Sequence, residues 1–161
     1  MTLGLALAAL AGIAILVLWL AFFKSARKSA PGPGRPPVEV LVIDDNPYVL
    51  DVVRLGLEQD GCKVHTIAVG RKGIEFFQQH AAEVNVVLLD YSMPEMDGAA
   101  VFEELQKINA TVPVILITGF CDDAKKSERL IQNVAGFLVK PFRLDQLVAV
   151  VRKVVKSAAR G

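Results

Sequence analysis

The sequence is poor in the residues that build metal clusters and redox motifs. Its 161 residues include two cysteines and two histidines. Cys62 and Cys121 match no spacing of metal ligands or redox motifs, and His65 and His80 have no catalytic partner nearby in the sequence. We therefore expect reduced thiols, and histidines that lie at the surface or at a strand edge.

The larger part of the chain, residues 38–161, has no excess of basic over acidic residues. Residues 1–37 contain four basic residues and no acidic residue, which leaves 14 basic and 17 acidic residues between 38 and 161. A mildly acidic body gives no electrostatic support for binding the phosphate backbone of nucleic acids. We therefore expect no nucleic-acid partner.

One long apolar run stands near the start of the chain. Residues 3–23 are 21 residues without a charge, and a helix of that length spans about 30 Å, the thickness of the hydrocarbon core of a bilayer. The basic stretch KSARK (24–28) follows, whereas a cleaved signal peptide carries its charge before a shorter apolar segment. A signal peptide and a soluble core helix are therefore less favoured than a membrane anchor over residues 1–24. The positive charge after the run places the remainder in the cytoplasm, at the plasma membrane of a prokaryote.

A proline-rich segment separates this apolar run from the rest of the chain. Residues 29–37, SAPGPGRPP, contain four prolines and two glycines, which exclude a helix or a central strand. We predict a semi-stiff linker over residues 25–37, and a globular domain over residues 38–161.

The globular domain alternates between strand-like and helix-like patterns. Between the apolar runs, residues recur at helical spacing, as Val49, Val52, Val53 and Leu57 do, and Gly61 is expected to end that helix. The runs rich in β-branched residues are 38–43, 62–67, 85–90, 112–118 and 136–139. Five strands alternating with five helices predict an α/β fold with a doubly wound parallel sheet. Asp97 is expected to cap the third helix.

Chemically reactive side chains end, or directly follow, four of the predicted strands. In a sheet of order 2-1-3-4-5, the carboxyl ends of those strands meet at one edge, where ligands bind in such folds. The side chains in question are Asp44, Asp45, Asp90, Thr118 and Lys140. Two carboxylates about 5 Å apart repel by roughly 3 kcal/mol at an effective dielectric constant near 20. Three carboxylates and one ammonium group leave a charge of −2, which a magnesium ion would balance. The alternative for Asp44 and Asp45 is that they only cap the following helix.

A site with a magnesium ion, a hydroxyl and an ammonium group suits a phosphoryl group. Phosphoryl transfer requires positioning and neutralisation of charge on the phosphoryl oxygens. Asp90 could then be a metal ligand only, or a nucleophile that forms an acyl phosphate. The residues alone leave both roles open.

Four segments, taken together, resemble a known family. VLVIDDN, VVLLDYSMPEMDG, PVILITG and GFLVKPF occur in the order and at the spacing of the receiver domain of two-component response regulators, including those like the chemotaxis regulator. The resemblance covers about residues 38–158. It implies a flavodoxin-like fold, and phosphorylation on Asp90 by a histidine kinase or a phosphotransfer protein.

The resemblance also assigns roles to individual residues. Asp45, Asp90 and the backbone carbonyl of Ser92 would bind Mg²⁺ directly, and Asp44 would help through water. Thr118 and Lys140 would contact phosphoryl oxygens, and Lys140–Pro141 would be a cis peptide bond. Phe137 would be the switch aromatic, although it could also be an ordinary core residue. Phe120 departs from the polar or small residue that is frequent at its position in the family, and is expected to hinder the access of water to an acyl phosphate.

The leading hypothesis is a membrane-tethered, single-domain response regulator without enzymatic turnover. Because the chain ends straight after the last predicted helix, we expect its signal to leave through a protein contact. The expected face comprises the helix before 136–139, the strand 136–139 and the last helix. Alternatives are a phosphate relay or sink, and a structural pseudo-receiver that is not phosphorylated. A phosphatase of the haloacid dehalogenase type is disfavoured, since Ser92 stands where that family has a second aspartate.

Overall fold

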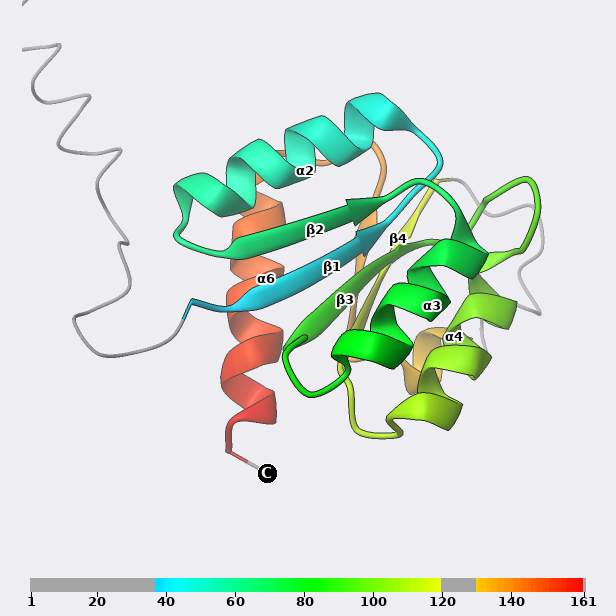
Figure 1. The fold of residues 1–161 in the computed structure, drawn as a ribbon. Coiled ribbons are helices and arrows are strands. Elements are labelled where there is room, and N and C mark those ends of the chain that lie inside the picture. Colours follow the sequence, from blue (N-terminus) through cyan, green and yellow to red (C-terminus); the bar gives the residue numbers. More distant parts are fainter. Residues whose placement is uncertain (1–36, 120–129, 161) are drawn as a thin grey trace, which may run out of the picture. The chain divides into compact units, whose positions relative to one another are not determined.

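A five-stranded parallel sheet forms the centre of the computed structural model, which describes residues 37–119 and 130–160 (Figure 1). The strand order is β2-β1-β3-β4-β5. The strands are β1 (Glu39–Ile43), β2 (Lys63–Ile67), β3 (Val86–Asp90), β4 (Val114–Thr118) and β5 (Gly136–Val139). Each strand falls on one of the five predicted runs, and the order agrees with the predicted 2-1-3-4-5. The doubly wound, flavodoxin-like fold is therefore confirmed.

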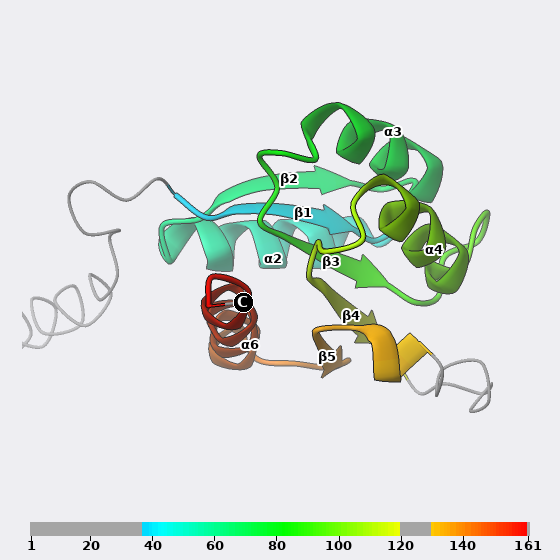
Figure 2. The ribbon, with the colours of Figure 1, turned by 90° about the horizontal axis from the view of Figure 1, so that it is seen from below.

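Helices cover both faces of the sheet. On one face lie α2 (Pro47–Gln59) and α6 (Leu144–Ala158), and on the other α3 (Gly70–His80) and α4 (Gly98–Ile108) (Figure 2). The remaining predicted helix, between β4 and β5, falls mostly on residues 120–129, which lie outside the described residues.

The core consists of two apolar clusters, one on each face of the sheet. Strand β3 contributes to both, because successive side chains of a strand point to opposite faces. Val86 and Leu88 pack against α2 and α6, whereas Val87 and Leu89 pack against α3 and α4. This double coverage explains why the central strands have nearly continuous apolar sequences.

Local side-chain bonds fix the ends of the helices around the sheet. The side chain of Asn46 accepts a hydrogen bond from the backbone N–H of Tyr48 and caps α2. The alternative that Asp44 and Asp45 serve only as a helix cap is therefore wrong. Asp97 caps α4 by accepting from Ala100, and Gly61 follows α2 with φ of 84°, so both of these predictions are confirmed.

The predicted apolar face of α2 needs a correction. Leu50, Val53 and Leu57 are buried against the sheet, whereas Val52 is exposed. Residues 50, 53 and 57 follow the three-to-four-residue spacing of one helical face, and residue 52 lies on its flank. A valine at helical spacing was thus mistaken for a core residue.

Within residues 37–119 and 130–160, the structure contains no helix that is long and apolar enough to cross a membrane. The anchor predicted over residues 1–24, and all of the predicted linker 25–37 except Pro37, lie outside the described residues.

Candidate functional site

The carboxyl ends of neighbouring strands bring the predicted site together. Asp44 directly follows β1, Asp90 ends β3 and Thr118 ends β4. Lys140 directly follows β5, the strand beside β4. The backbone N–H of Lys140 donates to the carbonyl of Thr118 at 2.7 Å, which continues the pairing of β4 with β5 by one residue. Residues from four separate segments therefore meet at one edge of the sheet.

Three carboxylates gather at this edge. Asp44, Asp45 and Asp90 each offer an oxygen, and these oxygens all lie within 4.8 Å of one another. Asp44 is 0% exposed and Asp90 is 4% exposed, whereas Asp45 is open to solvent. Oxygens bound on opposite sides of Mg²⁺, each about 2.1 Å from the ion, are about 4.2 Å apart. The spacing and the purely oxygen donor set therefore fit a magnesium ion with a small adjustment.

One ammonium group joins the two buried carboxylates. The Nζ atom of Lys140 lies 2.8 Å from Oδ2 of Asp44 and 3.1 Å from Oδ2 of Asp90. With Asp45 as the third acid, the cluster carries three negative charges and one positive charge. The net −2 that the sequence predicts is thus assembled in one place.

The charges in the cluster change the affinity of its groups for protons. Burial, and then the nearby charge of Asp44, raise the pKa of Asp90 above its ordinary value, although Lys140 acts in the opposite direction. Burial opposes the charged form of Lys140, but its bond to Asp44 and the charge of Asp90 outweigh this and raise the pKa of the ammonium group. Lys140 therefore stays charged, whereas the ionised form of Asp90 lowers the stability of the folded state.

The remaining predicted site residues lie around this cluster. The Thr118 side chain is buried, and its hydroxyl donates to the carbonyl of Gly119 at 3.1 Å. Ser92 is exposed, and its backbone N–H faces the Asp90 carboxylate and acts to lower the pKa of that group. The Lys140–Pro141 peptide bond is cis, as predicted. Phe120 lies outside the described residues.

Phe137 does not belong to the core of this structure. Its side chain is 56% exposed on β5, the strand at one edge of the sheet. The interpretation of Phe137 as an ordinary core residue is therefore wrong here. No described contact joins it to the carboxylate cluster, so its predicted role as a switch stays a prediction.

The first residue of α4, Gly98, has a role that the sequence analysis missed. Gly98 donates its N–H to the carbonyl of Tyr91 at 2.8 Å, which closes the loop between β3 and α4. A Cβ atom at Gly98 would lie 2.5 Å from the carbonyl oxygen of Asp90 and 2.8 Å from Cα of Tyr91. Only glycine fits such a close approach of backbone to backbone. The Asp-Gly pair at residues 97–98 was the available signal.

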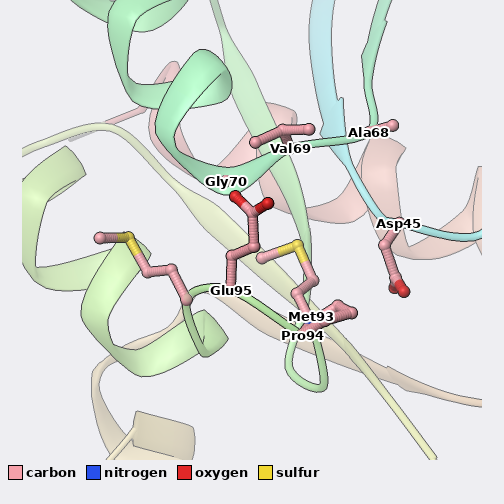
Figure 3. A pocket seen from close by; sticks show the side chains of 8 residues that line it. Asp45, Ala68, Val69, Gly70, Met93, Pro94 and Glu95 are labelled. Atoms are coloured by element: carbon pink, nitrogen blue, oxygen red, sulfur yellow. The ribbon is translucent and has the colours of Figure 1, made fainter.

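A small pocket lies beside Asp45 (Figure 3). The loop after β2 and the loop after β3 form its walls. Its lining residues are Asp45, Ala68, Val69, Gly70, Met93, Pro94, Glu95 and Met96. The site is therefore bordered by two loops whose side chains are largely apolar.

Comparison with known proteins agrees with this geometry. The family model described as "Response regulator receiver domain" matches residues 40–152. The chain belongs to this family. Receiver domains are phosphorylated on an aspartate, bind Mg²⁺ through an acidic cluster and interact with histidine kinases or phosphotransfer proteins.

The relatives that match this receiver are longer proteins, and the match covers only part of each. The transcriptional regulatory protein GlrR of Escherichia coli is 33% identical over 76% of this chain and 27% of its own length. The sensor kinase CckA of Brucella abortus is 34% identical over 73% of this chain and 12% of its own length. The transcriptional regulatory protein KdpE of Mycobacterium tuberculosis is 32% identical over 73% of this chain and 50% of its own length. The chain thus spans half or less of the length of these relatives.

Solved structures share the fold of this receiver. A response regulator receiver domain protein from Clostridium thermocellum is 27% identical, with a TM-score of 0.69, and the match covers 74% of this chain and 95% of that one. A CheY-like receiver domain protein from Methanospirillum hungatei, 21% identical, has a TM-score of 0.71 over 78% of this chain and 98% of its own. The second likeness is evidence for the fold alone.

Proposed function

We propose that this chain is a membrane-tethered receiver that accepts a phosphoryl group on Asp90 from a histidine kinase or a phosphotransfer protein. The observation that supports this best is the Asp90 carboxylate, which has an oxygen within 4.8 Å of oxygens of Asp44 and Asp45 and which Lys140 links to Asp44. A carboxylate in such surroundings is held in one place beside groups that can neutralise a phosphate.

In the proposed reaction, the chain supplies the nucleophile and the positioning groups. An oxygen of Asp90 forms a bond to phosphorus while the N–P bond of a phosphohistidine breaks, and the electron pair of that bond returns to the imidazole nitrogen. Lys140 exchanges its bond to Asp90 for one to a phosphoryl oxygen, and the Thr118 hydroxyl donates to another. Asp45, Asp90 and the Ser92 carbonyl, with Asp44 acting through water, would hold a Mg²⁺ ion, which would supply positive charge for the phosphoryl oxygens. Since the group stays on Asp90, this is acceptance and not enzymatic turnover.

An exposed apolar stripe on α2 supports a protein as phosphoryl donor. Tyr48, Val52 and Leu55 are exposed and recur at the spacing of one helical face, and Tyr48 is 81% exposed. The stripe begins three residues after Asp45, next to the site. Exposed apolar groups in a row commonly mark a protein contact, and a helix of the donor would cover this one.

We assign the downstream contact to the edge of the sheet formed by β5. Phe137 and Val139 are both exposed and alternate along this strand, so they lie on the same side of it. Phosphorylation would shift an equilibrium between two arrangements of this face, to which β5 and α6 belong among the described residues. A role as a phosphate relay or sink would use the same Asp90 chemistry.

The proposed location is the plasma membrane, with a single span over residues 3–23 and the receiver in the cytoplasm. The support is the uncharged run itself and the basic residues that follow it. Flotation of the full chain with vesicles of zwitterionic lipid tests the span. Recovery of the protein in the dense fraction would refute it.

Phosphorylation is tested by incubating the full chain, in neutral detergent, with acetyl phosphate and Mg²⁺. We expect one added phosphoryl group by intact mass, removed by hydroxylamine, and none when Mg²⁺ is chelated. Asp90→Asn should abolish the adduct, while Asp51→Asn, at an exposed position on α2, should leave it unchanged. No adduct on the wild type would favour a structural pseudo-receiver, and an adduct on Asp90→Asn would place the acceptor elsewhere.

A further inference from the structure

The exposed side of α6 carries basic residues and no acidic ones over its second half. Between Gln146 and Arg160 the sequence contains four basic residues and no acid. Lys153 and Lys156 are exposed and lie three residues apart on one side of α6, and Arg160, also exposed, follows just after the end of the helix. We call these three residues the basic stripe of α6.

The side chains of the basic stripe have no ion-pair partner among residues 37–119 and 130–160. The neighbouring Arg152 is bound to Asp60, with its Nε atom 2.7 Å from Oδ2. In the part of the chain that the structure describes, no carboxylate lies within ion-pair distance of the stripe. The helix dipole favours cations within the last turn, where Lys156 lies, but its effect does not reach back to Lys153. Stabilisation of the helix therefore explains the basic residue at position 156 but not the one at position 153.

The basic stripe lies at the edge of the sheet opposite the phosphoacceptor site. Helix α6 begins four residues after Lys140 and runs for 15 residues, or about 22 Å, toward the amino ends of the strands (Figure 1). The start of β1 lies at that same edge, where the carbonyl of Val38 accepts a hydrogen bond from the backbone N–H of Lys63 at 2.9 Å. Val38 and Val155 pack against the same apolar cluster. The stripe thus shares an edge with the point at which the chain arrives from residues 1–36.

We propose that the basic stripe of α6 binds the anionic phospholipid headgroups of the membrane into which residues 3–23 insert. The inference rests on the proposed membrane tether. Contact through this edge turns the Asp90 site away from the bilayer, toward the donor protein in the cytoplasm. Two membrane contacts, the spanning segment and the basic stripe, would then hold the receiver in one orientation.

The length of the linker and the charges on it favour lipid as the occupant. Residues 24–36 reach at most about 45 Å when fully extended, so the linker keeps the receiver within about 45 Å of the headgroups and lets the stripe reach them. Residues 24–35 add four basic side chains directly beside the span. Each basic residue near an anionic leaflet strengthens binding by roughly fivefold, and the stripe contributes three.

Lysine labelling of the full chain in lipid nanodiscs tests the contact. Nanodiscs of phosphatidylcholine alone are compared with nanodiscs that also contain phosphatidylglycerol, and acetylation by a water-soluble reagent is measured at each lysine by mass spectrometry. We expect Lys153 and Lys156 to react at least fivefold more slowly with the anionic lipid. Lys72, in the first turn of α3 at the opposite edge, should react equally in both. High salt should remove the difference, because about 1 M salt screens charges beyond about 3 Å.

Matched variants and the neutral nanodiscs distinguish a failure of the lipid contact from a failure of the membrane tether. Arg160→Gln should reduce the protection of Lys153 and Lys156 by roughly fivefold, whereas Arg71→Gln at the opposite edge should not change it. Equal rates at Lys153 and Lys156 in both lipids, or equal protection of Lys72, would overturn the inference and leave the tether intact. A chain that fails to associate even with phosphatidylcholine nanodiscs would refute the tether, and this inference with it.

Discussion

Replacing Asp90 with asparagine should stabilise the metal-free receiver. The change removes one of three crowded negative charges and keeps an oxygen beside the Ser92 N–H. Asparagine is nearly the same size as aspartate, so the packing around β3 stays as it is. The effect therefore reports the electrostatic cost of the carboxylate itself.

The magnitude follows from the distances in the cluster. At an effective dielectric constant near 20, carboxylate oxygens within 4.8 Å repel by about 3.5 kcal/mol for each of the two pairs that Asp90 makes. The Lys140 ammonium group at 3.1 Å from Asp90 offsets about 5 kcal/mol of this. Burial of the charge adds to the cost, whereas the exposure of Asp45 reduces it. We expect a net gain of about 1–2 kcal/mol in the free energy of unfolding, or about 5 °C in Tm.

The assay is thermal and urea unfolding of residues 37–161 in a chelator, followed by circular dichroism. Saturation with Mg²⁺ to ten times its Kd should stabilise the wild type by about 1.4 kcal/mol, and Asp90→Asn by less. Asp51→Asn on the exposed side of α2 is the control and should change stability by less than about 0.5 kcal/mol. An Asp90→Asn variant that is no more stable than the wild type without metal would refute the charge argument.

The same variant should show a particular dependence on pH. Because the pKa of Asp90 is raised above 3.8, the folded state binds its proton more tightly than the unfolded state does. The wild type therefore loses stability as pH rises from about 3.8 through the folded-state pKa, and Asp90→Asn does not. The advantage of the variant should grow over that range and disappear below it. An advantage that is constant with pH would contradict this account.

Three further substitutions test the surroundings of the site by urea unfolding. Lys140→Met leaves the buried Asp44 without its cation and should cost roughly 2–4 kcal/mol in a chelator; an unchanged midpoint would contradict the ion pair. Gly98→Ala should destabilise by more than about 2 kcal/mol, because its Cβ would meet the backbone of β3 at 2.5 Å. Gly119→Ala, where a Cβ would meet nothing within 4 Å, is the matched control. Asn46→Ala removes the cap of α2 and should cost about 1 kcal/mol, and no loss would mean that the cap is replaced by water.

The sequence predicted the fold well because its signals were local and repeated. Each apolar run ended in a turn residue or a charge, and parallel strands with helical crossovers allow few topologies. Those two facts are enough to place Asp44, Asp90 and Lys140 at one edge of the sheet. The same logic found the Asp97 cap, which depends on contacts within four residues.

What could not be predicted depends on contacts between distant segments. Asp44 and Asp45 are neighbours in the sequence, yet one is fully buried and the other exposed. The spacing of apolar residues likewise predicted that Val52 is a core residue. Spacing alone does not show which side of a helix packs against the sheet. The two distances from Lys140 to the carboxylates, 2.8 and 3.1 Å, depend on how the ends of three separate strands are placed relative to one another. The sequence holds no signal for such a distance.

The backbone bond between Lys140 and Thr118 has a further consequence for how the receiver would respond. The two residues predicted to touch phosphate are bonded directly through their main chains. A shift of either backbone must move the other or break the bond, so sensing by the hydroxyl and by the ammonium group would be concerted and not sequential. A change that weakens the pairing of β4 with β5 would then weaken the responses of Thr118 and Lys140 together, even if every acidic side chain is kept.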